Sequence, residues 1–345
     1  MSGEVLIRCD DVHKTYEARR TLRELVMPRH GDGHAIRALD GVSFRLERGR
    51  VLGVAGESGS GKSTLANLLV GLERPTGGLI RMGDRDLARL HGKELLAFRR
   101  QVQMVFQDPF ASLNPRFTVR RTVEEPLVIH GIGDRASRLA RVREALEEAD
   151  LRPAELFLDR FPHQLSGGQR QRAAIARAIV LRPSALVADE PVSMLDVSVR
   201  AGILRLLRGL VDRLAMSLVF ITHDLSLIGQ MCDELAIMYQ GRIVELGPAL
   251  DVLAKPLHPY TRALIAAVPV PDPEQRPADD AVALLEAMAP SASVHGCRFA
   301  LRCVYAVKRC HGDDPRLRPI DGAHEGACHE IERIRTAEKE KSWRH

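Results

Sequence analysis

Short apolar runs, followed by longer segments with helical spacing, recur along this chain. Val51–Ala55, Ala185–Ala188 and Leu218–Thr222 have the length and composition of strands that are buried on both faces. Lys62–Val70, which follows the first run, has its apolar residues at the spacing of a helix. The pattern therefore predicts an α/β fold with parallel strands.

The order of these patterns indicates how the chain is organised. Residues 4–50 have strand patterns, the segment after residue 109 is rich in helix, and closely spaced prolines follow residue 268. The predicted regions are a core over residues 4–268 with a helical part at about 109–180, a proline-rich linker over 269–277, and a separate C-terminal extension over 278–345.

Composition agrees with an α/β protein that does not itself cross a membrane. The chain has 345 residues, of which 45% are hydrophobic and 4% aromatic. No apolar run approaches the ~20 residues of a membrane-spanning helix, and Met1–Asp10 does not resemble a signal peptide. The formal net charge is +5, but arginines alternate with acids, as in Arg141–Glu148. This alternation indicates solvated helix faces and not a nucleic-acid-binding stripe.

A glycine-rich loop joins the first apolar run to the helix after it. Its sequence fits G-x-x-x-x-G-K-[ST], the pattern of a loop that binds nucleotide phosphates. Lys62 would reach the β- and γ-phosphates, and Ser63 would ligate Mg²⁺. An ordinary glycine turn is the alternative, but the strand and helix on either side favour ATP binding. The predicted site comprises Gly56, Ser58, Gly59, Ser60, Gly61, Lys62, Ser63 and Thr64.

Asp189 and Glu190 follow directly on the second apolar run. Open α/β sheets place their chemistry at the carboxyl ends of strands. We expect Asp189 to hold Mg²⁺, directly or through water, and Glu190 to act as general base on the attacking water. A solvated acidic turn is the alternative.

The sequence Leu165-Ser166-Gly167-Gly168-Gln169 lies about a hundred residues after the glycine loop. With both motifs, residues 4 to about 268 resemble the ATP-binding subunits of ATP-binding-cassette (ABC) transporters. The resemblance implies a P-loop NTPase core with an N-terminal antiparallel β subdomain and a helical subdomain. It also implies that Ser166, Gly167, Gly168 and Gln169 form the signature motif, which faces the nucleotide of a second cassette. Ser166 is a favourable N-cap for a helix over Gly167–Ile179, whose N-terminus could receive a phosphate.

Four further residues match functional positions of that family. By this resemblance, Gln107 is the Q-loop glutamine, which senses Mg²⁺ and contacts the membrane subunits, and Asp196 is the D-loop aspartate. His223 is the switch histidine that contacts the γ-phosphate, although a single histidine is more often a capping or core residue. Tyr16 is the candidate for stacking on adenine, although a single aromatic residue in a strand usually serves packing.

His258-Pro259-Tyr260-Thr261 and Gln107–Arg116 resemble the ATPases of oligopeptide and dipeptide permeases. That resemblance implies ATP-driven peptide import, with the chain bound peripherally on the cytoplasmic face of the inner membrane. The implied partners are a second, different ATP-binding subunit, two transmembrane permeases and, indirectly, an extracytoplasmic substrate-binding protein, with no nucleic acid. A polar insertion from about Ala18 to His34 resembles the second type of ATP-binding subunit. Importers of nickel, glutathione and oligosaccharides belong to the same group, so the cargo stays open.

Four of the six cysteines are grouped near the C-terminus, at Cys297, Cys303, Cys310 and Cys328. Cytosolic proteins seldom keep disulfides, so such a group favours a metal. Four thiolates suit Zn²⁺ or an iron–sulfur cluster. The close C-x2-4-C pairs of zinc sites are absent, and the surrounding sequence resembles peptide-permease ATPases that carry a 4Fe–4S cluster. We therefore favour a 4Fe–4S cluster, with Zn²⁺ and unmetallated thiols as alternatives.

The metal is expected to act as a structural staple, because the extension has few large apolar residues with which to form a core. Arg298 and Arg302 could offset the negative charge of a cluster. The nearby histidines are expected to be ordinary solvent-facing loop residues, namely His295, His311, His324 and His329. Because a linker separates the extension from the core, ATP binding is expected to survive loss of the metal.

Two other functions compete with transport. A soluble cassette ATPase of translation or DNA repair is disfavoured, because the chain has one cassette and no nucleic-acid stripe. A non-enzymatic redox regulator is disfavoured, because Lys62, Asp189, Glu190 and His223 supply what a hydrolase needs.

Overall fold

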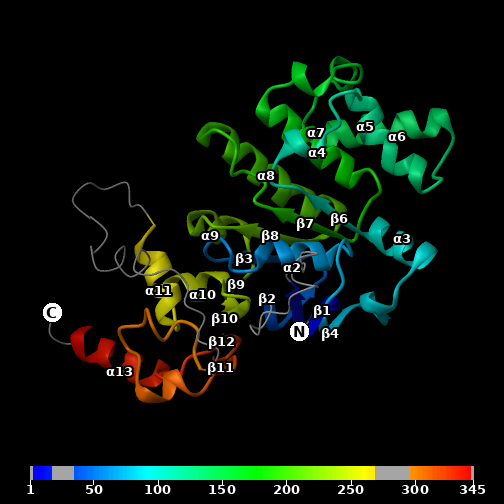
Figure 1. Ribbon diagram of the computed structural model, residues 1–345. Helices are drawn as coiled ribbons and strands as arrows, with labels where there is room; N and C mark the ends of the chain where they lie inside the picture. The colour runs from blue at the N-terminus through cyan, green and yellow to red at the C-terminus, as the bar shows by residue number, and fades with distance from the viewer. Residues whose placement is uncertain (1–2, 18–34, 269–295, 343–345) are drawn as a thin grey trace, which may run out of the picture.

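The buried apolar runs form the middle of an eight-stranded sheet in the order β11-β12-β10-β9-β3-β8-β7-β6 (Figure 1). The five strands β3, β6, β7, β8 and β9 run parallel, and β10, β11 and β12 add antiparallel pairs at one side. The sheet is therefore mixed, with the predicted parallel strands at its centre. The strands are β3 Val51–Ala55, β6 Val102–Val105, β7 Ala185–Asp189, β8 Ser217–Thr222, β9 Glu234–Tyr239, β10 Arg242–Pro248, β11 Arg318–Asp321 and β12 His324–Gly326.

The computed structural model describes residues 3–17, 35–268 and 296–342. The predicted linker over 269–277 and the polar insertion from Ala18 to His34 lie outside these ranges.

A second, four-stranded sheet is formed by the N-terminal residues, in the order β2-β1-β4-β5. All of its pairs are antiparallel, and they join β1 Val5–Tyr16, β2 Ile36–Glu47, β4 Gly77–Met82 and β5 Arg85–Asp86. Helix α2, Lys62–Leu69, shares one buried core with both sheets, to which it contributes Leu65, Leu68 and Leu69. The helix that follows the glycine loop is therefore fixed between the two sheets.

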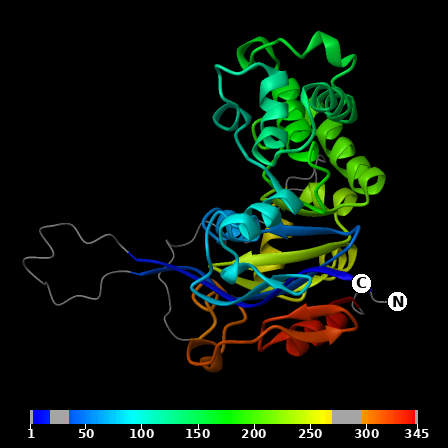
Figure 2. The same cartoon turned by 90° about the vertical axis from the view of Figure 1, so that its right-hand side faces the viewer.

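The segment from Pro109 to Ile179 is helical and forms a part of the molecule distant from the N-terminal sheet (Figure 2). Its helices pack around α7, whose apolar face includes Ile175 and Ile179. The α-helices beyond α2 are α3 Gly92–Gln101, α4 Pro109–Ser112, α5 Val119–Ile129, α6 Arg135–Glu148, α7 Gly167–Ile179, α8 Val197–Leu214, α9 Ile228–Met231, α10 Ala249–Ala254, α11 Pro259–Ala266 and α13 Ile331–Ser342. Short 3-10 turns lie at Leu87–Arg89, Ala154–Leu156, Pro162–Gln164, Leu225–Leu227 and Lys308–His311.

The C-terminal extension is joined to the core. From the sequence we had expected it to be separate. Strand β12 pairs with β10, where Glu245 faces Gly326 and Leu246 faces Glu325. Phe299 is buried in the same core cluster as the central strands. The proline-rich segment suggested a separate unit, but β10 has an edge that β12 covers, and this long-range pairing leaves no local sequence signal.

Within the described ranges, no helix is long and apolar enough to span a membrane.

Candidate nucleotide site

The glycine loop runs from the end of β3 to the start of α2. Gly61, the N-cap of α2, has a φ of 101°, and a Cβ there would lie 2.4 Å from the carbonyl oxygen of Ala38. A Cβ at Gly56 would lie 2.2 Å from the carbonyl oxygen of Met238. Both positions therefore need glycine, because the loop passes directly against the neighbouring backbone.

Lys62 lies along the inside of this loop. Its Nζ donates to the carbonyl oxygens of Gly56, at 2.8 Å, and of Glu57, at 2.7 Å. Burial lowers the pKa of the Lys62 ammonium, while the carboxylates of Glu190 and Asp189 act in the opposite direction. The predicted phosphate-binding lysine thus lies close enough to both predicted acids to interact with their charges.

Ser63 and Asp189 come together from the start of α2 and the end of β7. The Ser63 hydroxyl hydrogen-bonds to the Asp189 carboxylate, and burial raises the pKa of that carboxyl group. A hydroxyl and a carboxylate are the hard oxygen ligands that Mg²⁺ prefers. The two side chains therefore fit the Mg²⁺ that the sequence predicts here.

Gln107, Glu190 and His223 meet beside the loop, although long stretches of chain separate them. Nε2 of Gln107 donates to Oε2 of Glu190 at 2.9 Å, and Nδ1 of His223 lies 3.1 Å from Oε1 of Glu190. The three residues follow β6, β7 and β8, which are adjacent in the sheet. Parallel strands place their carboxyl ends at one edge, so these side chains converge there.

Glu190 also has a backbone conformation that is unusual for a non-glycine residue, with a φ of 45°. The Glu190 N–H donates to the Ile221 carbonyl oxygen at 3.0 Å. The Glu190 carbonyl oxygen accepts from the Ser193 hydroxyl, also at 3.0 Å. Such conformations gather at functional sites, where the surrounding structure holds them in place.

A cavity of about 1080 Å³ connects these groups. Its lining includes the predicted residues Ser58, Gly59, Gly61, Lys62, Ser63, Thr64, Gln107, Glu190 and His223. Ser60 is buried, and its carbonyl oxygen accepts from the N–H of Gly241 at 2.9 Å, so this residue supports the loop from behind. Gly296, Arg298 and Asp314 of the C-terminal extension also line the cavity, which the sequence had not suggested.

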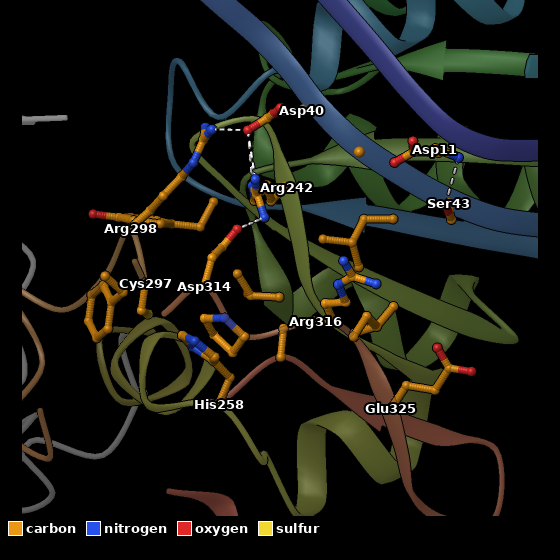
Figure 3. Close-up of a pocket in the computed structure, with 18 of the residues that line it drawn as sticks. Asp11, Asp40, Ser43, Arg242, His258, Cys297, Arg298, Asp314, Arg316 and Glu325 are labelled. Atoms are coloured by element: carbon orange, nitrogen blue, oxygen red, sulfur yellow. Dashed lines mark hydrogen bonds and ion pairs between the residues drawn. The ribbon is translucent and has the colours of Figure 1, made fainter. Parts of the chain in front are cut away.

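An ion network closes the side of this cavity that the extension contributes. Arg242 donates to Asp40 at 2.8 Å and also pairs with Asp314, while Arg298 pairs with Asp40. Burial alone would raise the pKa of Asp40, but the guanidinium groups of Arg242 and Arg298 lower it below its usual value. Figure 3 shows the network at the rim of a second cavity, of about 740 Å³, which shares these four side chains.

Tyr16, the candidate for stacking on adenine, lies at the end of β1. Its hydroxyl donates to Oε2 of Glu73 at 2.7 Å and also hydrogen-bonds to the Thr64 side chain. Tyr16 is 37% exposed, and its ring centroid lies 5.0 Å from Nζ of Lys14. Its role toward adenine stays a prediction.

The signature motif lies away from the cavity. Figure 1 shows α7 within the helical part, apart from α2. Among the described residues that line the cavity, none belongs to the signature motif. Ser166 is the N-cap of α7, as predicted: its hydroxyl accepts from the Gln169 N–H at 3.3 Å, and Gln169 accepts in return from the Ser166 N–H at 3.0 Å. Asp196, which the sequence predicts to be the D-loop aspartate, is exposed at the N-cap of α8.

The segment His258-Pro259-Tyr260-Thr261, here called the HPY segment, has a structural role that we did not predict from the sequence. His258 is the N-cap of α11, because its Nδ1 accepts from the Tyr260 N–H at 3.0 Å. Burial lowers the pKa of His258 to about 4. The Tyr260 hydroxyl accepts from the Glu57 N–H of the glycine loop at 2.9 Å. The segment thus reaches back from α11 to the nucleotide site.

His324, expected to be solvent-facing, is instead buried. Its Nε2 lies 2.8 Å from Oε1 of Glu245, which is fully buried and also accepts from the N–H groups of Leu257 and His258. Because β12 adds to the sheet, a histidine of a short C-terminal strand becomes a partner for a buried carboxylate.

The four grouped cysteines come together in the extension. The Cys297 N–H donates to the Cys310 carbonyl oxygen at 2.8 Å. Burial first, and then the charges of neighbouring cysteines such as Cys328 and Cys310, raise the pKa of Cys297 to about 12 and that of Cys303 to about 11. Among the described residues, however, no three His, Cys, Asp or Glu side chains are placed to hold a single metal ion.

Backbone N–H groups point at three of these sulfurs, each from the residue two positions later. The donors are those of Phe299 toward Cys297, Tyr305 toward Cys303, and Glu330 toward Cys328, the last at 3.4 Å. Such bonds favour the thiolate form, which is the form that binds metals.

Comparison with known proteins agrees with this geometry. Residues 39–193 match the family model described as ABC transporter, and residues 244–310 match the model described as oligopeptide/dipeptide transporter, C-terminal region. The di/tripeptide transport ATP-binding protein DppF of Pseudomonas aeruginosa is 42% identical over 334 residues, which cover 96% of this chain and 99% of that protein. The chain belongs to the ABC transporter ATP-binding proteins.

Solved structures of ABC cassettes share this fold. The bacterial ABC transporter cassette MJ0796, solved as a dimer, aligns with a TM-score of 0.61 at 31% identity. The alignment covers 71% of this chain and 99% of that one. A post-hydrolysis structure of the same cassette, bound to ADP and Pi, aligns with a TM-score of 0.60. This protein is thus an ABC ATPase subunit, whose fold and family indicate ATP hydrolysis.

Proposed function

We propose that this ATPase subunit powers the import of dipeptides and oligopeptides through a membrane permease, from the cytoplasmic face of the inner membrane. The cluster of Gln107, Glu190 and His223 beside the phosphate loop carries the assignment of hydrolysis. The match of residues 244–310 to the oligopeptide/dipeptide transporter region supports the peptide cargo, as does the name of the P. aeruginosa relative.

Each side chain of the site has a separate role in ATP hydrolysis. Lys62 and the loop N–H groups bind the phosphates of ATP, and Ser63, Asp189 and Gln107 would hold Mg²⁺, which when bound neutralises phosphate charge. Glu190 takes the proton of the attacking water. His223, beside Glu190, donates toward the γ-phosphate.

The second half of each site comes from another chain. The signature motif is at the N-terminus of α7, where N–H groups and the helix dipole favour a phosphate. Its distance from the chain's own cavity supports a partner cassette as the source of that phosphate. We propose that the partner is a second ATP-binding subunit of different sequence and that Gln107 and its neighbours contact two permeases. An extracytoplasmic protein delivers the cargo.

Reconstitution tests this function. The chain is assembled with the permeases and ATP-binding subunit that copurify with it, in liposomes containing its binding protein. Dipeptide should stimulate phosphate release, and it should accumulate on the side of the membrane that carries the ATPase subunits. Nickel, glutathione and an oligosaccharide should do neither. Stimulation by one of these controls in place of peptide would overturn the cargo. Recovery of the chain without any integral membrane protein would overturn transport itself.

We also propose that Cys297, Cys303, Cys310 and Cys328 hold a 4Fe–4S cluster, with Zn²⁺ as the alternative. The three N–H groups aimed at sulfur support thiolate ligands. The spacing of the four cysteines along the chain, which lacks the close C-x2-4-C pairs of zinc sites, is what favours the cluster over Zn²⁺.

Metal analysis separates the two. Protein purified without oxygen should be brown and contain about four irons per chain, and a Cys310→Ser variant should lose the colour. Colourless protein with one zinc per chain would show that the site holds Zn²⁺ and not a cluster. Protein with no metal would show that the four cysteines are unmetallated thiols.

A further inference from the structure

The phosphate loop contains an acid that the nucleotide chemistry does not explain. Glu57 directly follows Gly56, in a loop whose function is to bind a polyanion. Its side chain is not among those lining the nucleotide cavity, so it does not face the phosphates. A free carboxylate at this position would repel ATP, because charges in a partly buried site are weakly screened.

Arg302 of the C-terminal extension neutralises that acid. Its Nη2 lies 3.0 Å from Oε1 of Glu57 and its Nη1 lies 3.1 Å from Oε2, so the contact is bidentate. Bidentate arginine–carboxylate pairs combine charge neutralisation with a fixed geometry. The two residues are 245 positions apart in the sequence.

Arg302 is itself held in place by aromatic side chains. The guanidinium lies 5.7 Å from the ring centroid of Tyr239 and 5.6 Å from that of Phe299. Its side chain is only 10% exposed, and Nη1 also lies 3.3 Å from the Tyr239 hydroxyl. The pair is therefore more rigid and less screened than a surface salt bridge.

Helix α11 holds Glu57 at its backbone as well. The Tyr260 hydroxyl accepts from the Glu57 N–H, and the Tyr260 ring packs against Tyr239 and Phe299 at centroid distances of 4.6 and 5.5 Å. Lys62 bonds to the Glu57 carbonyl oxygen. The conformation of this one loop residue thus depends on α11, on the cysteine-bearing segment and on the phosphate-binding lysine together.

We propose that Arg302 is a positioning residue for ATP binding, which acts by neutralising Glu57 and fixing the phosphate loop. The proposal rests on this loop being the ATP site. It changes one expectation from the sequence: Arg302 directly precedes Cys303, so damage to the cysteine-bearing segment reaches the phosphate loop. Arg298, which directly follows Cys297, provides a second link through its pair with Asp40.

A charge-rescue experiment on the full chain tests this. ATP affinity is measured by calorimetry for Arg302→Gln, Glu57→Gln and the double variant. We expect Arg302→Gln to weaken ATP binding on the order of tenfold, because the Glu57 carboxylate is left unpaired in the phosphate loop, where its charge adds to the negative potential that ATP meets. Glu57→Gln alone should lose less affinity than Arg302→Gln, because it weakens the contact without leaving an unpaired carboxylate in the loop. The double variant should recover most of the loss, because the repulsive charge is gone.

Arg309→Gln is the matched control. Arg309 also directly precedes a cysteine and pairs with an acid, Asp313, at 2.9 Å, but on an exposed surface of the extension. It should bind ATP like wild type. Added salt should reduce the defect of Arg302→Gln, since salt screens repulsion, and should not change that of a variant whose loop is merely misfolded.

The outcomes are distinct. Wild-type affinity in Arg302→Gln would overturn the proposal, as would a double variant no better than the single one. Should Arg302→Gln fold poorly, Arg302→Lys keeps the charge and should bind ATP more tightly than Arg302→Met; equal affinities would count against the charge argument. Lys62→Ala, measured alongside, tests the site itself. If Lys62→Ala bound ATP normally, the ATP site and not the role of Arg302 would be wrong.

Discussion

Replacing Glu190 by glutamine separates ATP binding from hydrolysis. The change keeps the size of a side chain that contacts Gln107 and His223, at 2.9 and 3.1 Å. It removes the proton acceptor for the attacking water. A positioned base contributes about 10²–10⁴-fold, so we expect at least a 10²-fold loss, or about 2.7 kcal/mol of barrier at 1.36 kcal/mol per decade.

Binding should change in the other direction. The Glu190 carboxylate favours the charged form of Lys62, so it lies close enough to the phosphate site to act on charges there. Removing it lowers the negative charge that ATP meets. We therefore expect Glu190→Gln to bind ATP at least as tightly as wild type and to hold the two cassettes closed.

Phosphate release by the assembled transporter measures the first effect, and ATP binding by the chain measures the second. Glu155→Gln is the control, because Glu155 is an exposed residue of the helical part that pairs with Arg143 at 3.2 Å. It should match wild type in both assays. Hydrolysis by Glu190→Gln within about twofold of wild type would refute its role as general base.

Three further changes test other parts of the site. Lys62→Ala should weaken ATP binding itself, measured by calorimetry, because it removes the cation from the phosphates; unchanged affinity would count against that role. Ser166→Asp keeps a good N-cap but adds a charge where the partner's phosphate should lie, so the single chain should bind ATP normally while the assembled transporter loses hydrolysis. Ser166→Asn, an equally good but neutral cap, should keep more activity, and equal loss in both would contradict the two-chain site. The buried His258 has a folded pKa of about 4, below its unfolded value, so its contribution to stability is present above about pH 6.5 and falls by about 1.4 kcal/mol per unit as pH drops toward 4. Denaturant unfolding should show that His258→Asn lacks this part of the pH slope; the same slope in both proteins would show that His258 does not titrate as described.

The local features of this protein could be predicted from its sequence. Strand, glycine loop and helix are consecutive, so Val51–Leu69 specifies its own geometry. The cap of α7 is equally local, because Ser166 and Gln169 are three residues apart. Both motifs consist of neighbours in the chain, and their hydrogen bonds need no distant partner.

Tertiary structure decided which distant residues meet. Gln107, Glu190 and His223 converge because β6, β7 and β8 are adjacent in the sheet. The order of these strands cannot be predicted from the sequence of any single segment. The sequence pattern marked a linker, and so predicted that the C-terminal extension was independent. Instead, a three-residue strand pairs with β10, and Arg302 reaches Glu57 across 245 positions. A bare carboxylate in the phosphate loop and an arginine beside a cysteine have no local reason to be related. They meet in the folded chain, where Arg302 lies against the packed rings of Tyr239 and Phe299.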